Sequence, residues 1–164
     1  MHRTSVTVIV VGILGIVGLP GAAHAVVFGQ LDDFENGTVM DWRHANFSPT
    51  NPVNVPDGGP GGAGDAFLRN NSLGGSGAHS RQVIFNQSQW LGDYNAAGVT
   101  RVTGFMINLG STPLFMRVAI EGAGSQFSST TAIPLPAGGG WQPVTFDLTP
   151  SRMTSVAEIG RAHV

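Results

Sequence analysis

The stretch Asp32-Asp33-Phe34-Glu35-Asn36-Gly37-Thr38, followed by Trp42, decides how we interpret the rest of the chain. It places three carboxylates within four positions, then a turn and then an aromatic residue. Asn36-Gly37 indicates a tight turn, because both residues tolerate positive φ angles. We therefore expect a strand over 26–34 that ends at an acidic corner, and a second strand over 39–47 that directs Trp42 toward the core.

Short strand patterns separated by glycine and proline turns continue along the chain. The 24 Gly and 10 Pro residues occur in a chain that is 41% hydrophobic, which favours many turns over disorder. We expect 101–109 to form a hairpin with 114–120, and 48–64 to be a loop. The other expected elements are strands at 65–70, 80–86, 128–133 and 141–148, turns at 72–77 and 90–97, and a short helix or one more strand within 149–158. No helical period is long enough for an α/β fold, so the pattern predicts an all-β protein, an antiparallel two-sheet β-sandwich.

The N-terminus has the features of a secretory signal peptide. Met1-His2-Arg3 supplies a positive start, an apolar run covers 6–19, and Ala23-His24-Ala25 is a small-x-small cleavage site. The alternative is a membrane anchor, but the run is short for a spanning helix of about 20 residues. We expect 1–25 to be a signal peptide, so that a secreted mature chain without a membrane span begins at Val26.

Composition limits the classes of partner. The chain has 164 residues, which is enough for one domain with a core. Only 11% of residues are charged and the formal net charge is -2, so the sequence has no basic surface typical of nucleic-acid binding. It contains no Cys, so packing, or a bound metal ion, must stabilise the fold without disulfides.

Four motifs taken together resemble those of a large group of bacterial secreted domains. They are DDFENGT with Trp42, GGPGGAGDAFL at 58–68, QWLGDYNAAGVT at 89–100 and LPAGGGWQPVTFDL at 135–148. This group is similar to jelly-roll carbohydrate-binding modules and to the galactose-binding-like fold, and its members often end in an exosortase-type sorting tail. The resemblance implies a two-sheet jelly roll, with a calcium ion held between the first strand, a nearby loop and the last strand.

The C-terminal end departs from that group. No closing strand of the Asp-Asn-aliphatic kind and no sorting tail follow the strand pattern at 141–148. In addition, Ile159-Gly160-Arg161-Ala162-His163-Val164 resembles a translated sequencing adapter. We therefore expect a β-sandwich domain at 26–158 that lacks its last strand, with a non-native tail at 159–164.

Three carboxylates are candidate calcium ligands. Ca²⁺ takes six to eight oxygen ligands from carboxylates and backbone carbonyls. Asp33 and Glu35 stand two positions apart, so on a strand their side chains share a face. Asp65 follows a glycine-rich loop that can turn carbonyls inward. The alternative is that all three are ordinary solvated acids at the ends of strands.

Aromatic and polar residues between the glycine turns are candidates for sugar binding. Sugar rings stack on exposed aromatic side chains, while amides and charged groups bind the hydroxyls. Trp90, Tyr94 and Trp141 are the candidate stacking residues, with Arg81, Gln82, Asn86 and Gln89 as polar partners. We expect Trp42 and Trp141 to be core residues, because they lie on strand patterns and bury a large area.

No pattern of catalytic residues is present. The sequence lacks a Gly-x-Ser-x-Gly elbow and a His-Glu-x-x-His helix, and His44 and His79 are expected to be surface or loop residues. The sequence therefore predicts a secreted, non-catalytic module that binds a polysaccharide or surface glycan. The alternatives are a structural or adhesion domain of a cell-surface-sorted protein without a small ligand, and the accessory domain of a lost extracellular hydrolase.

Overall fold

The computed structural model describes residues 5–12, 25–44, 51–71, 82–122 and 124–156. These residues form strands and one short 3₁₀ helix, which confirms the predicted all-β class. In the part of the chain that is described, no helix is long and apolar enough to cross a bilayer. The elements are β1 (Ser5–Gly12), β2 (Trp42–His44), β3 (Val53–Val55), β4 (Phe67–Arg69), β5 (Gln82–Asn86), β6 (Arg101–Met106), β7 (Leu114–Gly122), β8 (Ser125–Ser129), β9 (Ile133–Leu135), β10 (Gln142–Asp147), η2 (Pro150–Arg152) and β11 (Met153–Ser155).

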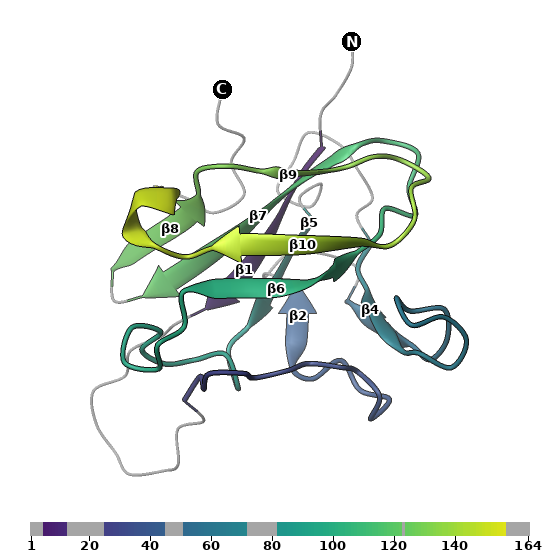
Figure 1. The fold of residues 1–164 in the computed structure, drawn as a ribbon, viewed down its shortest axis with the longest axis horizontal. Helices are drawn as coiled ribbons and strands as arrows, with labels where there is room; N and C mark the ends of the chain where they lie inside the picture. The colour runs from purple at the N-terminus through teal and green to yellow at the C-terminus, as the bar shows by residue number, and fades with distance from the viewer. Residues whose placement is uncertain (1–4, 13–24, 45–50, 72–81, 123, 157–164) are drawn as a thin grey trace.

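The described strands form one large sheet and two strand pairs (Figure 1). The large sheet has seven strands along the path β11-β8-β7-β1-β5-β2, with β9 also paired to β7. β10 pairs with β6, and β3 pairs with β4. In the view of Figure 1 the β6–β10 pair lies across the large sheet, as the second layer of a sandwich. Among the described pairings, only the two made by β1 are parallel.

The core lies between these two layers. In β10 the buried Val144 and Phe146 alternate with the exposed Pro143 and Thr145, as expected of a strand with one face in the core. Burying an apolar side chain of this size contributes about 1.5–3 kcal/mol, so packing between the layers is the main source of stability. The buried core cluster consists of Val26, Trp42, Ile84, Tyr94, Met116, Val118, Leu135, Val144 and Phe146.

The predicted first strand is wrong. Residues 26–34 form turns and irregular backbone, with a turn closed by a hydrogen bond from the Gln30 amide to the Val27 carbonyl (3.2 Å). Phe34 has a φ of 62°, which a strand residue cannot adopt. The Asn54 side chain, from β3, donates to the Phe34 carbonyl (2.7 Å) and to the Thr38 carbonyl (2.9 Å). β3 thus lies inside the expected loop and holds the acidic corner in place.

The predicted hairpin between 101–109 and 114–120 is also wrong. β6 pairs with β10, whereas β7 pairs with β1, β8 and β9. The buried Asn108 directs the chain from one layer to the other: its side-chain amide donates to the Thr112 carbonyl (2.8 Å) and to the Leu135 carbonyl (3.1 Å). The expected strand at 128–133 is divided between β8 and β9, and 149–158 contains both a short helix and a strand.

His44 is buried, so the predicted surface position is wrong. Its side chain is 8% exposed and shares the inward face of β2 with Trp42. The ring Nδ1 lies 3.0 Å from the Val83 carbonyl oxygen. Because a carbonyl only accepts hydrogen bonds, Nδ1 carries the proton in the neutral ring. Burial lowers the pKa of His44, and the hydrogen bond to Val83 partly opposes that shift. His79 lies outside the described residues.

Stability is expected to fall as the pH drops below the ordinary histidine pKa of about 6.5. Since the pKa of His44 is lower in the folded chain, the unfolded chain takes up the proton first, and this favours unfolding until the pH passes below the folded value. His44→Asn keeps an N–H donor near the Val83 carbonyl but cannot titrate. Urea unfolding between about pH 7.5 and pH 5 should show a flatter stability profile for H44N. Parallel profiles would mean that His44 does not set this pH dependence.

Candidate functional site

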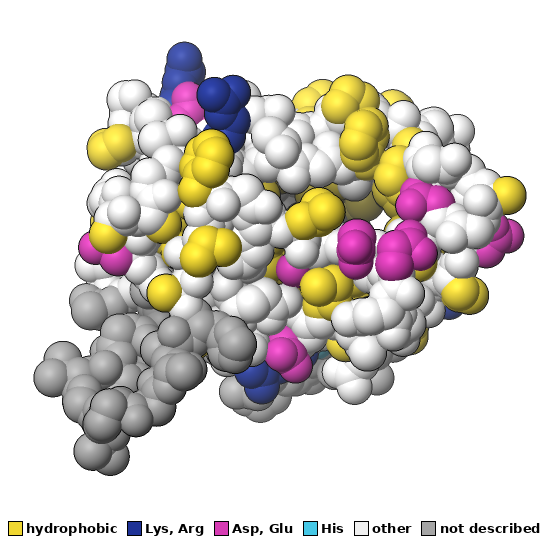
Figure 2. Space-filling view, turned by 60° about the horizontal axis from the view of Figure 1, so that its bottom comes forward, with side chains coloured by type: hydrophobic (Ala, Val, Ile, Leu, Met, Phe, Trp, Pro, Cys, Tyr) yellow, Lys and Arg dark blue, Asp and Glu magenta, His cyan; other side chains and the backbone are white. Residues whose placement is uncertain are grey.

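A cleft of about 890 Å³ opens beside β6, and residues on both faces of that strand line it. Other lining residues come from distant parts of the chain: 30–34, 65–71, the segment 107–112 and Trp141. Core residues of both layers, among them Met116, Val118, Val144 and Phe146, also line the cleft, so it reaches down between the layers. Figure 2 shows a hollow in the surface with acidic side chains gathered beside it and apolar side chains at its rim. The volume lies in the range of about 300–1,000 Å³ that is typical of ligand sites.

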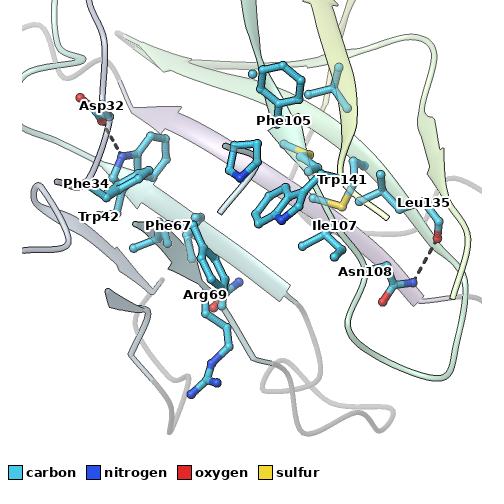
Figure 3. A pocket seen from close by; sticks show the side chains of 18 of the residues that line it. Asp32, Phe34, Trp42, Phe67, Arg69, Phe105, Ile107, Asn108, Leu135 and Trp141 are labelled. Atoms are coloured by element: carbon cyan, nitrogen blue, oxygen red, sulfur yellow. Dashed lines mark hydrogen bonds between the residues drawn. The ribbon is translucent and has the colours of Figure 1, made fainter. Parts of the chain in front are cut away.

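An aromatic wall forms one side of the cleft. The rings of Phe67, from β4, and Trp141 meet edge to face, with centroids 5.2 Å apart. The Trp141 Nε1 donates to the Gly58 carbonyl (2.9 Å), and Phe105 of β6, which is 57% exposed, also lines the cleft (Figure 3). Trp141 is therefore a half-buried cleft residue, and the prediction that it belongs to the core is wrong.

The glycine-rich loop beside this wall has a defined shape. The Asp65 carboxylate accepts a hydrogen bond from the Gly61 amide (2.5 Å), and the Asp57 carboxylate accepts one from the Gly64 amide (2.6 Å). A Cβ at Gly59 would lie 2.5 Å from Asp65 Oδ2, so only glycine fits there. The loop therefore presents the Gly58 carbonyl to Trp141 in a fixed position.

The Asp32 carboxylate joins the acidic corner to two tryptophans. Its Oδ2 accepts hydrogen bonds from Trp42 Nε1 (2.7 Å), from Trp90 Nε1 (2.7 Å) and from Gln89 Nε2 (3.2 Å). The bond to Trp42 is drawn in Figure 3. The two indole rings lie 6.4 Å apart between centroids. Three donors from two parts of the chain, Trp42 and the adjacent pair Gln89 and Trp90, thus meet at a single carboxylate oxygen, which fixes one end of the cleft.

The structure separates the predicted sugar-binding residues. Trp90 lines the cleft, but Tyr94 is 6% exposed and its hydroxyl donates to the Trp90 carbonyl (3.0 Å). Burial also raises the pKa of Tyr94. Asn86 is fully buried, and its side chain bonds with the Met40 carbonyl and the Ser88 amide. Arg81 lies outside the described residues.

The three predicted calcium ligands each accept a backbone hydrogen bond. Asp33 Oδ1 accepts from the Glu35 amide (3.2 Å), Glu35 Oε1 accepts from the Ala66 amide (2.8 Å), and Asp65 accepts from Gly61. Asp33 and Asp65 line the cleft, whereas Glu35 does not. Within the described ranges, no three Asp, Glu, His or Cys side chains are grouped closely enough to hold a metal ion. Calcium binding at these residues stays a prediction.

Two buried polar atoms at the cleft are without a hydrogen-bond partner among the described residues. They are Gln30 Nε2, a donor, and Asn70 Oδ1, an acceptor. Both atoms have almost no exposed surface, and an unsatisfied buried polar group costs about 1–3 kcal/mol. Each atom must therefore come to the surface of the cleft before a ligand can bond with it.

From the sequence, Trp141 is a candidate stacking residue for which a core position is favoured, and no pattern marks Phe67, Phe105 or Asn70 as site residues. A usable signal is the glycine run that precedes Phe67, at 58–64, and the one that precedes Trp141, at 138–140. Such runs bring backbone close to an aromatic side chain and leave it partly uncovered.

No protein-family model matches the chain, and comparisons with curated proteins and with solved structures also give no significant match. The described residues define an all-β domain with a cleft of ligand size.

Proposed function

We propose that this protein is a secreted, non-catalytic binding module that takes a segment of a carbohydrate chain into the cleft. The observation that carries the proposal is the joining, in one cleft, of partly exposed aromatic side chains with polar side chains from several parts of the chain. The signal-peptide pattern at 1–25 supports the secreted location.

The aromatic wall accounts for the apolar part of this recognition. Sugar rings carry apolar C–H faces, which pack against aromatic faces of the kind that Phe67, Trp141 and Phe105 present. Because the Trp141 indole is fixed by its bond to Gly58 and by its contact with Phe67, little side-chain entropy is lost on binding.

The polar side chains account for recognition of hydroxyl groups. A hydroxyl both donates and accepts hydrogen bonds, so it suits the amide side chains of Gln30 and Asn70, which line the cleft. Asp33 adds an exposed carboxylate acceptor, and Arg69 adds a guanidinium donor at the same cleft. Neutral or weakly charged sugars suit this lining, in which both signs of charge occur.

The proposal predicts that the cleft variants Trp141→Ala and Phe67→Ala weaken retention on the polysaccharide that binds the wild type. The expected loss is about tenfold or more in affinity for each, equivalent to about 1.4 kcal/mol. Affinity electrophoresis of the full chain against a panel of soluble glycans measures it. The matched control is Phe127→Ala, since Phe127 is 40% exposed on β8 and does not line the cleft.

Two results would argue against the proposal. One is that no glycan in the panel retards the wild-type chain. The other is that F127A weakens retention as strongly as the cleft variants do. Because removing Trp141 also deletes a contact with the glycine loop, urea unfolding of each variant shows whether a loss of binding reflects a loss of folding.

A second candidate function, adhesion through contact with another protein, is favoured by an apolar surface near the N-terminal segment. Val27, Phe28 and Leu31 are 58%, 82% and 72% exposed. Exposed apolar side chains that are neighbours on a surface are typical of protein contacts. Substituting Val27 and Phe28 by Ser should abolish adhesion of this kind and leave glycan retention unchanged, since neither residue lines the cleft.

A further inference from the structure

β1 occupies a position in the large sheet that differs from every other described strand. It lies between β5 and β7 and runs parallel to both. Residues Thr7 to Val11 are in register with Gln82 to Asn86, and Ser5 to Gly12 are in register with Leu114 to Glu121. In Figure 1 the three strands lie side by side at the centre of the sheet.

The register requires β5 and β7 to run in the same direction, about 10 Å apart, because neighbouring strands are separated by about 4.7–4.9 Å. If β1 were absent, both strands would have an unpaired edge in the interior of the sheet. Buried backbone groups without partners are strongly unfavourable. The buried Ile84 and Val118, which are in register with Ile9 on either side, would lie beside the gap.

The sequence of β1 suits an interior parallel strand. All six residues from Val6 to Val11 are β-branched, and the segment contains no proline and no charge. Strands that are covered on both faces have such continuous runs of Val and Ile, and β-branched residues favour the extended backbone. This is the longest β-branched run in the chain.

The same residues lie within the predicted leader at 1–25, while the next part of the fold begins at the predicted cleavage site. Val26 is 3% exposed and belongs to the core cluster. Its amide donates to the Leu91 carbonyl (2.6 Å), and a Cβ at Gly92 would lie 2.9 Å from its nitrogen. Val26 is therefore held by contacts with the segment at 91–92 and not by β1.

From these observations we propose that the position between β5 and β7 is a strand-acceptor site whose occupant is the Ser5–Gly12 segment. A chain that lacks this segment has an open acceptor, which binds a β-branched peptide by completing the backbone ladders of both neighbouring strands. This site is distinct from the cleft, and it does not depend on carbohydrate binding.

Engineered cysteine pairs in the full chain test whether β1 lies between β5 and β7 in the parallel register. Each pair can be interpreted alone, because the chain has no native cysteine. In the parallel register Thr7 is opposite Gln82, whereas Val11 is four residues further along β5, about 13 Å away. The variant T7C/Q82C should form a disulfide under mild oxidation, and V11C/Q82C should not. A disulfide only in V11C/Q82C would show an antiparallel strand, and one in neither would show that β1 does not occupy the site. Either result overturns the proposal.

Cutting the folded chain tests whether the site accepts a separate peptide. A protease recognition sequence is placed within residues 13–24, the full chain is folded and then cut, and the fragment that contains Ser5–Gly12 is followed by mass spectrometry under native conditions. We expect the fragment to stay bound and to be displaced by a labelled synthetic peptide of residues 4–13. The same peptide with Ile9→Pro, which lacks a ladder donor, should fail to displace it.

Hydrogen exchange distinguishes the outcomes. The proposal is supported if the fragment stays bound and the amides of β5 and β7 are protected. It is also supported if the fragment is released, the amides of β5 and β7 then exchange fast, and added peptide restores their protection. Release with β5 and β7 still protected in a monomer would show that the sheet closes by itself, and this overturns the proposal. Release with protection restored by dimerisation would assign the site to a second copy of the chain and overturn Ser5–Gly12 as its occupant.

Discussion

Replacing Asp32 by alanine is expected to lower the free energy of unfolding by about 4 kcal/mol. Asp32 Oδ2 is the acceptor for two indole N–H groups at 2.7 Å and for the Gln89 amide at 3.2 Å. Hydrogen bonds to a charged group contribute about 1.5–3 kcal/mol each, and the abandoned donors are partly buried. The loss combines several such bonds, which are not additive in a shared network. Urea unfolding monitored by tryptophan fluorescence measures it.

The neighbouring Asp33→Ala is the matched control. Asp33 is exposed, and it accepts a local hydrogen bond from the Glu35 amide. We expect D33A to cost less than about 1 kcal/mol, as is usual for surface substitutions. Asp32→Asn, which keeps one oxygen but loses the charge, should fall between the two. Equal losses for D32A and D33A would contradict the role assigned to the Asp32 carboxylate.

Replacing Asn86 by leucine is expected to lower the free energy of unfolding by about 3 kcal/mol. Asn86 is fully buried, its Nδ2 donates to the Met40 carbonyl (2.9 Å), and its Oδ1 accepts from the Ser88 amide (3.0 Å). Leucine has a similar volume but leaves the Ser88 amide without this acceptor, and an unsatisfied buried group costs about 1–3 kcal/mol. Misfit of the branched side chain adds a similar amount. Chemical denaturation gives the value.

Asn86 contributes to stability because it holds the turn before β2 in place. Met40 and Asp41 have φ angles of 46° and 60°, an unfavourable conformation for residues with a Cβ. The Met40 carbonyl is held by Asn86 and also by Gln89 Nε2 (2.6 Å), so the surroundings stabilise the strained turn. The control is Asn95→Leu, at an exposed turn position, with an expected change below about 0.5 kcal/mol. If N95L were as destabilising as N86L, burial of Asn86 would not be the cause.

The fold class could be predicted because its signals are local. Glycine and proline turns separate β-branched runs, and the alternation around Val144 and Phe146 defines the buried face of β10 without any long-range information. Trp42 is buried as predicted, since its strand pattern places it on the inward face of β2.

The errors have a different physical origin. The left-handed backbone at Phe34 results from hydrogen bonds made by Asn54, which is 20 residues away, and no local preference of phenylalanine indicates it. The pairing of β6 with β10 is decided by Asn108, which bonds with the Leu135 carbonyl and so directs the intervening chain to the other layer.

The cleft could not be predicted because its walls are far apart in sequence. Phe67 and Trp141 are separated by more than 70 positions, yet their rings are in contact. Trp141 has the pattern of a core residue, yet it is only half-buried, and its ring packs against Phe67 in the wall of the cleft. The residues that we predicted from local pattern, Tyr94 and Asn86, are instead buried structural residues.

The most direct test of carbohydrate binding in the cleft is hydrogen exchange of the full chain, measured with and without a saturating oligosaccharide from the glycan that retards it. The account predicts slower exchange in the cleft segments 67–71 and 102–112 and unchanged exchange in β8 and β11, which do not line the cleft. Slower exchange confined to β8 and β11, or no change at saturation, would contradict it.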